Sequence, residues 1–154
     1  MPAVLRALLL SVAATLVLAP QASAERLPGS NHGGLRLTAA MTGDQEVPGP
    51  GDPDGSGLAT ITLNKGQNEV CWLLEVEDIE PATAAHIHRG PAGVAGPIVV
   101  PLSPPTDGTS SGCAVLEDGS TLIDEIRSNP EAFYVNVHNE PHPAGAIRGQ
   151  LTKK

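Results

Sequence analysis

Residues 57–76 read GLATITLNKGQNEVCWLLEV, and this stretch decides the fold class. Apolar and polar residues alternate through Gly57–Leu63 and again through Glu69–Val76, a pattern typical of strands with one buried face. The five residues between them, Asn64–Asn68, have the composition of a turn. The two runs are therefore predicted to pair as an antiparallel hairpin, with Ala59, Ile61 and Leu63 on one face.

Short alternating runs separated by Gly/Pro-rich turns continue along the chain. Further strands are predicted at Leu35–Ala39, Ala84–His88, Ile98–Leu102, Gly112–Leu116, Ala132–His138 and Ala146–Thr152. One helix is predicted at Thr121–Asn129, with a capping box at Thr121–Asp124 and Pro130 as its end. Seven or eight strands with a single helix indicate an all-β fold, an antiparallel β-sandwich or barrel.

The N-terminal segment has the features of a secretory signal peptide. One arginine precedes the apolar run 7–19, and Ala22-Ser23-Ala24 is a small-residue cleavage signal. We therefore expect residues 1–24 to be removed, residues 25–34 to form a flexible lead-in, and residues 35–152 to form one domain. The mature chain, Glu25–Lys154, has no second apolar stretch that could span a bilayer and is expected to be secreted or periplasmic.

The composition of the mature chain excludes some classes of partner. Loss of Arg6 leaves eight Lys/Arg against 17 Asp/Glu, a formal charge of −9. Such a charge argues against binding to nucleic acid or to an anionic membrane, which both need a cationic surface. Trp72, Phe133 and Tyr134 are its only aromatic residues apart from histidine, so the core must consist of aliphatic side chains.

The chain has two cysteines, Cys71 and Cys113, both in predicted strands. An even number of cysteines in an exported chain favours a disulfide between them. Two buried free thiols are the alternative.

Three histidines carry the spacing that suggests chemistry. His86 and His88 are two residues apart on one predicted strand and therefore leave the same face, while His138 ends another strand. If the two strands meet, the three imidazoles can bind copper or zinc, with His142 as a candidate fourth ligand. The alternative is that these histidines only make hydrogen bonds across the barrel.

Two further residues are candidates for a supporting role around such a site. Asn136 shares a face with His138, so it either orients an imidazole or satisfies a backbone group. Arg148 is either a guide for anions or, the interpretation we favour, a structural hydrogen-bond donor. No nucleophile–base arrangement with recognisable surroundings is present, so no catalytic residue is predicted and a non-enzymatic role is favoured.

Three motifs resemble the CHRD (chordin) domain family over about Leu35–Leu151. They are Ala85–His88 with glycines at 90, 93 and 96, the run Tyr134–His138 after Asn-Pro, and Pro143–Leu151 containing Ile-Arg-Gly-Gln. One departure is Ala146, where the family usually carries glutamate. The resemblance implies an immunoglobulin-like β-barrel with limited similarity to copper/zinc superoxide dismutases.

The dismutase likeness extends to individual residues. The strand with His86 and His88 is similar to the dismutase strand that carries two copper-binding histidines, and His138 is similar to a later copper ligand. Gly145 and Arg148 resemble residues near the dismutase active site. The dismutase loop that carries the zinc ligands has no counterpart, so a copper–zinc site is not expected. By family resemblance, the protein is an extracellular binding or structural module with another protein as partner, as in chordin. The alternative is a small copper or zinc protein that handles copper or reacts with superoxide.

Overall fold

A computed structural model describes residues 34–153. The predicted signal peptide and the predicted lead-in up to residue 33 lie outside these residues. Within the described part there are nine strands and one α-helix, with three short 3₁₀ turns. The strands are β1 (Leu35–Thr42), β2 (Ser56–Asn64), β3 (Glu69–Glu77), β4 (Ala82–Arg89), β5 (Ile98–Leu102), β6 (Thr109–Val115), β7 (Phe133–Asn139), β8 (Ile147–Gln150) and β9 (Thr152–Lys153), and the helix is α1 (Leu122–Ser128).

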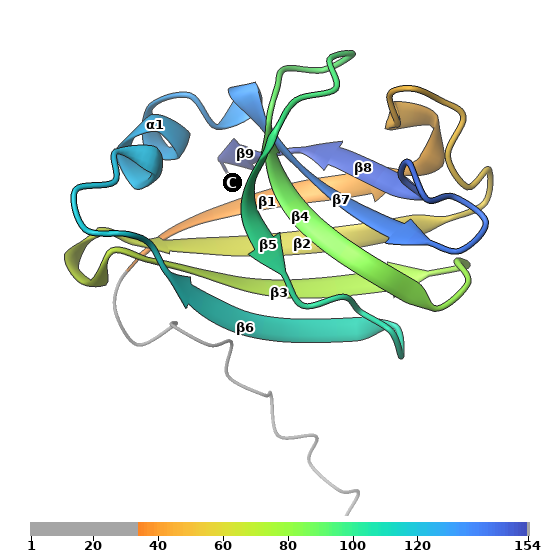
Figure 1. The fold of residues 1–154 in the computed structure, drawn as a ribbon, viewed down its shortest axis with the longest axis horizontal. Coiled ribbons are helices and arrows are strands. Elements are labelled where there is room, and N and C mark those ends of the chain that lie inside the picture. The colour runs from red at the N-terminus through yellow and green to blue at the C-terminus, as the bar shows by residue number, and fades with distance from the viewer. Residues whose placement is uncertain (1–33, 154) are drawn as a thin grey trace, which may run out of the picture.

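The strands form one antiparallel sheet in the order β5-β4-β7-β8-β1-β2-β3-β6, with β9 paired to β1. The sheet curls so that β4 and β5 cross in front of β1–β3 (Figure 1), which makes a nearly closed barrel. The edge strands β5 and β6 are joined at one end, where the Ser110 hydroxyl donates to the Ser103 carbonyl at 2.7 Å. The predicted all-β antiparallel fold with one short helix is confirmed. The predicted last strand is split at Leu151 into β8 and β9.

The core lies inside the curled sheet and follows the alternation of the sequence. Ala59, Ile61 and Leu63 of β2 are fully buried, as the hairpin pattern predicts. The β2–β3 hairpin pairs in continuous register from Ser56↔Glu77 to Asn64↔Glu69. Because successive side chains leave opposite faces, one set of residues fills the barrel while the other set remains available for surface chemistry.

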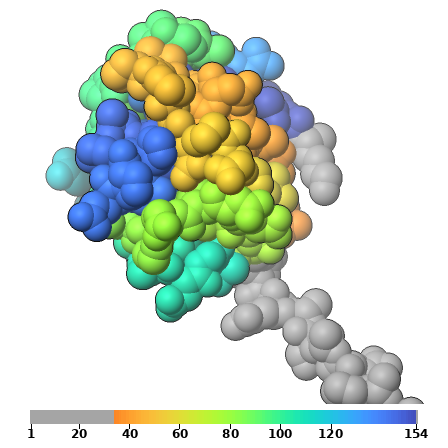
Figure 2. Space-filling model, turned by 90° about the vertical axis from the view of Figure 1, so that its right-hand side faces the viewer, coloured from red at the N-terminus to blue at the C-terminus, as the bar shows by residue number. Residues whose placement is uncertain are grey.

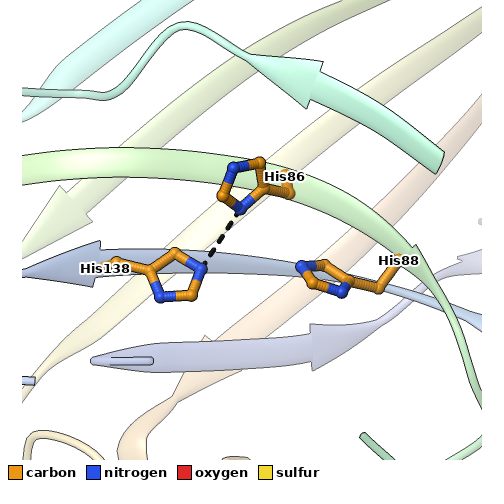
Figure 3. A group of neighbouring side chains, drawn as sticks. All are labelled: His86, His88 and His138. Atoms are coloured by element: carbon orange, nitrogen blue, oxygen red, sulfur yellow. Dashed lines mark hydrogen bonds between the residues drawn. The ribbon is translucent and has the colours of Figure 1, made fainter. Parts of the chain in front are cut away.

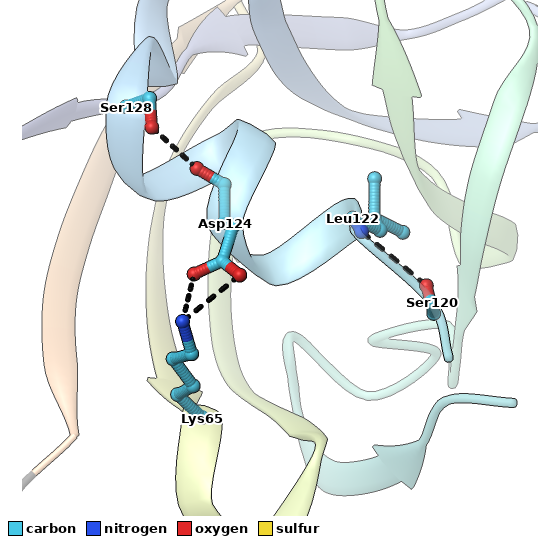
Figure 4. A network of polar contacts seen from close by, with 5 residues as sticks. All are labelled: Lys65, Ser120, Leu122, Asp124 and Ser128. Atoms are coloured by element: carbon cyan, nitrogen blue, oxygen red, sulfur yellow. Dashed lines mark hydrogen bonds and ion pairs between the residues drawn. The ribbon is translucent and has the colours of Figure 1, made fainter. Parts of the chain in front are cut away.

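The helix α1 covers one end of the barrel with Ile123 and Ile126, both buried. The predicted capping box does not form: Thr121 makes no side-chain cap, and Asp124 instead pairs with Lys65 at the β2–β3 turn (Figure 4). The Ser120 hydroxyl accepts the Leu122 amide at 3.3 Å in place of the cap. In the part of the chain that the structure describes, no helix is long and apolar enough to cross a membrane.

The two cysteines form the predicted disulfide. Cys71 on β3 and Cys113 on β6 are directly opposite in register, and their sulfur atoms are bonded. Cys71 is fully buried, whereas Cys113 faces solvent on the edge strand. The alternative of two buried free thiols is wrong.

Loops from distant parts of the sequence pack together at the opposite end of the barrel from α1. Figure 2 shows residues 43–55 and 139–146 side by side on this end. The Asp52 amide donates to the Ala146 carbonyl at 2.8 Å, which joins the two loops. The first of these loops carries Glu46 to the outer face of the neighbouring strands, where the candidate site lies.

Candidate metal centre

The outer face of β4, β7 and β8 carries polar side chains in aligned rows. His86 on β4 is directly opposite Asn136 on β7, and Asn136 is directly opposite Arg148 on β8. The next row along the strands consists of His88, Tyr134 and Gln150. His138 is two residues from Asn136 and therefore leaves the same face of β7.

The three histidines predicted from the sequence converge on this face (Figure 3). One nitrogen from each ring lies within 4.8 Å of the corresponding nitrogens of the other two. His86 Nδ1 is 3.2 Å from His138 Nε2, and the His86 ring centroid is 5.5 Å from that of His88. Two nitrogens that are each about 2.0–2.1 Å from one ion are at most about 4.2 Å apart, so the His86–His138 pair at 3.2 Å has the spacing of two ligands of one ion, and His88 lies beside it.

Backbone carbonyls fix the tautomers of two of the rings. His88 Nδ1 is 2.8 Å from the Gly96 carbonyl oxygen, and His138 Nδ1 is 3.1 Å from that of Pro143. A carbonyl oxygen only accepts, so each Nδ1 carries the proton and each Nε2 keeps its lone pair. His88 Nε2 is buried and has no hydrogen-bond partner. A buried imidazole with one nitrogen held by a carbonyl and the other left unpaired is the arrangement found in metal-binding histidines.

The environment keeps two of the rings neutral. Burial, together with smaller effects of the neighbouring His138 and His88, lowers the pKa of His86 to about 4. Burial also lowers the pKa of His138, with a smaller opposing effect from the Pro143 carbonyl. Both rings are therefore neutral at neutral pH, which is the charge state that a metal-binding imidazole needs.

The glycine-rich turn after β4 holds the histidine face in place. Gly96 accepts from His88 through its carbonyl, and its amide donates to the Tyr134 hydroxyl at 3.2 Å. A Cβ at Gly96 would overlap the Arg89 carbonyl, so only glycine fits there. The Tyr134 ring stacks on His88 at 4.8 Å between centroids. One residue of the turn thus positions both rings.

Arg148 lies beneath this turn and is 1% exposed. Its Nη2 donates to the Pro91 carbonyl at 2.9 Å and to Gln150 Oε1 at 3.0 Å, and its guanidinium covers the Tyr134 ring at 3.5 Å. These contacts are those of a structural hydrogen-bond donor. A side chain buried in this way is poorly placed to guide anions from solvent.

Glu46 was not singled out by the sequence because it sits in a loop rich in glycine and proline. Its pKa is raised to about 7, because burial raises it by more than the charge of Arg148, the Val47 amide and the Asn136 side chain lower it. Glu46 thus provides a carboxyl near Arg148 even though position 146 is alanine. A Cβ at Gly145 would overlap the Glu46 carboxylate, so glycine at 145 leaves room for it.

His142, the candidate fourth ligand, lies apart from the three-histidine cluster. Its Nε2 is 3.8 Å from the Asp52 carboxylate, and its backbone amide donates to Asn139 Oδ1 at 2.9 Å. Asn136, in contrast, lies inside the cluster, with its Oδ1 3.2 Å from His138 Nε2.

Together, the fold and the site define an antiparallel β-barrel with three converging histidines on its outer face. The profile of the CHRD domain family matches residues 37–151. The chain therefore belongs to the CHRD domain family. No curated protein and no solved structure matches the chain.

Proposed function

We propose that this CHRD domain binds one copper or zinc ion through His86, His88 and His138. The observation that supports this proposal best is the pairing of a carbonyl-bound Nδ1 with a buried, unpartnered Nε2 on His88. An unpaired buried polar atom costs about 1–3 kcal/mol, and a purely structural role for His88 leaves this cost uncompensated. A metal ion bound to His88 Nε2 would supply the missing partner through a coordinate bond.

The protonation states support the proposal as well. His88 and His138 offer Nε2 lone pairs, while His86 Nδ1 lies 3.2 Å from His138 Nε2 and donates its proton there when no ion is bound. Binding would move the His86 proton to its other nitrogen and free the Nδ1 lone pair. Imidazole suits both copper and zinc.

The protein would perform this role outside the cytoplasm. The signal-peptide pattern of residues 1–24 and the Cys71–Cys113 disulfide both support export to a secreted or periplasmic location. An extracellular protein partner, as the family resemblance implies, is compatible with the metal site, although residues 34–153 present no specific contact surface that supports it.

The test is titration of the purified, untagged protein with Cu(II) or Zn(II) after treatment with a chelator. We expect one equivalent to bind, the double variant His86→Ala plus His88→Ala to lose binding, and the matched variant His142→Ala to keep it. Calorimetry that finds no saturable binding at micromolar metal would refute the proposal. The protein would then be a metal-free binding or structural module.

A further inference from the structure

We propose that Asn136 supplies the fourth ligand of this site through its side-chain oxygen, which makes a divalent-metal centre of three nitrogens and one oxygen. This inference rests on the proposed metal-binding function. It adds a ligand that histidine spacing alone does not indicate.

The strand register places Asn136 at the middle of the cluster. It is directly opposite His86, two residues from His138, and two residues from Tyr134, the cross-strand partner of His88. Directly opposite residues have Cβ atoms about 4.5–5.5 Å apart, and their diagonal neighbours are still within reach of long side chains. The Asn136 side chain, which is 3% exposed, is therefore a direct or diagonal neighbour of all three imidazoles.

The contact between Asn136 and His138 lacks a hydrogen when both groups are neutral. Asn136 Oδ1 is 3.2 Å from His138 Nε2. The Nδ1 proton of His138 is directed at the Pro143 carbonyl, so Nε2 has a lone pair only. Two acceptors that face each other repel, and a cation bound between them would replace this repulsion with two favourable bonds.

The neighbouring Glu46 carboxyl favours the carboxamide orientation that this role needs. The Asn136 side chain lowers the pKa of the Glu46 carboxyl, as an N–H directed at a carboxylate does. Donation by Nδ2 to Glu46 leaves Oδ1 on the side of His138. Glu46 would also compensate part of the positive charge that an ion adds to four neutral ligands.

The donor set indicates which ions the site should prefer. Three imidazoles and one carbonyl-type oxygen suit Zn(II) in a tetrahedral arrangement and also suit Cu(II). Cu(I) prefers the softer sulfur ligands. We therefore expect a preference for the divalent ions.

The experiment compares Asn136→Ala with wild type and with Asn139→Ala, a matched variant at another buried asparagine of β7. Loss of an outer-shell partner weakens metal binding about 10- to 100-fold, so if Oδ1 is a ligand, Asn136→Ala should weaken Zn(II) and Cu(II) binding by at least about 10-fold. Asn139→Ala should leave both affinities unchanged. Competition with a chelating dye measures the affinities, and circular dichroism checks folding.

A spectroscopic measurement separates a ligand from a positioning residue. Wild-type protein labelled with ¹³C at the asparagine side-chain carbonyl and loaded with Cu(II) should show a ¹³C coupling to the copper in pulsed ENDOR. The coupling decides the question even if Asn136→Ala fails to fold. If the coupling is absent, Asn136 is not a ligand, whatever the variant does to affinity.

If the Asn136 side-chain amide has the opposite orientation, the expected effect of Asn136→Ala on metal affinity is reversed. If Nδ2 donates to His138 Nε2, the alanine variant frees that lone pair, so binding should be unchanged or tighter. That result would overturn the role of Asn136 and leave the three-histidine site standing. Absence of saturable binding by wild type would instead refute the metal site itself.

Discussion

Two cross-strand clusters on this barrel show the same geometry and opposite chemistry. Cys71 and Cys113 are directly opposite on β3 and β6, just as His86 and Asn136 are directly opposite on β4 and β7. Each pair belongs to a group of three or more metal-type ligand atoms within a few ångströms of one another. Convergence of ligand atoms is therefore not enough to identify a metal site.

The difference is whether the converging atoms already have partners. The two sulfurs are bonded to each other, so Glu69 beside them has no thiolate with which to share a metal. The histidine cluster keeps an unpaired His88 Nε2, and its His138 Nε2, which accepts from His86, also faces a second acceptor, Asn136 Oδ1. We infer that the cysteine cluster stabilises the fold. The histidine cluster leaves polar atoms unsatisfied, which lowers stability, and a bound ion would satisfy them.

The largest expected effect tests the stabilising role of the disulfide. Replacing both Cys71 and Cys113 with alanine opens a loop of 42 residues, and the chain-entropy model predicts a loss of about 4 kcal/mol. Denaturant unfolding of the metal-free protein measures this loss. Metal affinity should not change, because the cysteines lie on strands that do not carry the histidines. A loss below about 1 kcal/mol, or an accompanying loss of metal binding, would break the contrast between the two clusters.

The next effect comes from Glu46 and depends on pH. Its pKa is 4.5 without burial and about 7 in the fold, so the folded state binds more protons between these values. Its contribution is therefore fully present below pH 4.5 and is lost as the pH rises through 7. Glu46→Gln removes this loss. The free energy of unfolding of the variant, relative to that of wild type, should therefore rise by about 2 kcal/mol from pH 4.5 to pH 8, a value reduced for screening by solvent.

Comparing the variant with wild type isolates Glu46 from the histidines. His86 has a lowered pKa, and its effect on stability runs in the opposite direction, rising with pH from about 4 to 6.5. That effect is common to both proteins and cancels in the difference. A difference in unfolding free energy that stays constant with pH would show that Glu46 titrates normally in the fold.

A smaller effect on stability is expected at His88, despite its burial. His88→Phe keeps the stacking on Tyr134 and loses the bond to the Gly96 carbonyl, but it also removes the unpaired Nε2. The lost hydrogen bond costs about 0.5–1.5 kcal/mol and removal of the unpaired polar atom returns about 1–3 kcal/mol, so the two effects largely offset each other. The metal-free variant should unfold within about 1 kcal/mol of wild type and bind no metal. A large destabilisation would instead favour a structural role for this histidine.

The sequence predicted those features that depend on local pattern. Alternation located the hairpin of β2 and β3, and the i, i+2 spacing placed His86 and His88 on one face. Family motifs supported the meeting of β4 and β7, which brings in His138. Other features depend on contacts distant in sequence: Glu46 reaches the site from a loop, and Asp124 pairs with Lys65 rather than capping its helix. No local periodicity encodes such contacts.

The smallest expected effect concerns the Lys65–Asp124 pair, which joins the β2–β3 turn to α1 (Figure 4). The nitrogen and oxygen are 2.7 Å apart, yet the side chains are 63% and 54% exposed. Exposed ion pairs contribute little because water screens them and two long side chains lose freedom. Lys65→Met should therefore reduce the free energy of unfolding by at most about 0.5 kcal/mol, measured by denaturant titration at low and high salt. The buried Ile123 and Ile126 would then hold the helix, and a loss above about 1.5 kcal/mol would show that charge does so instead.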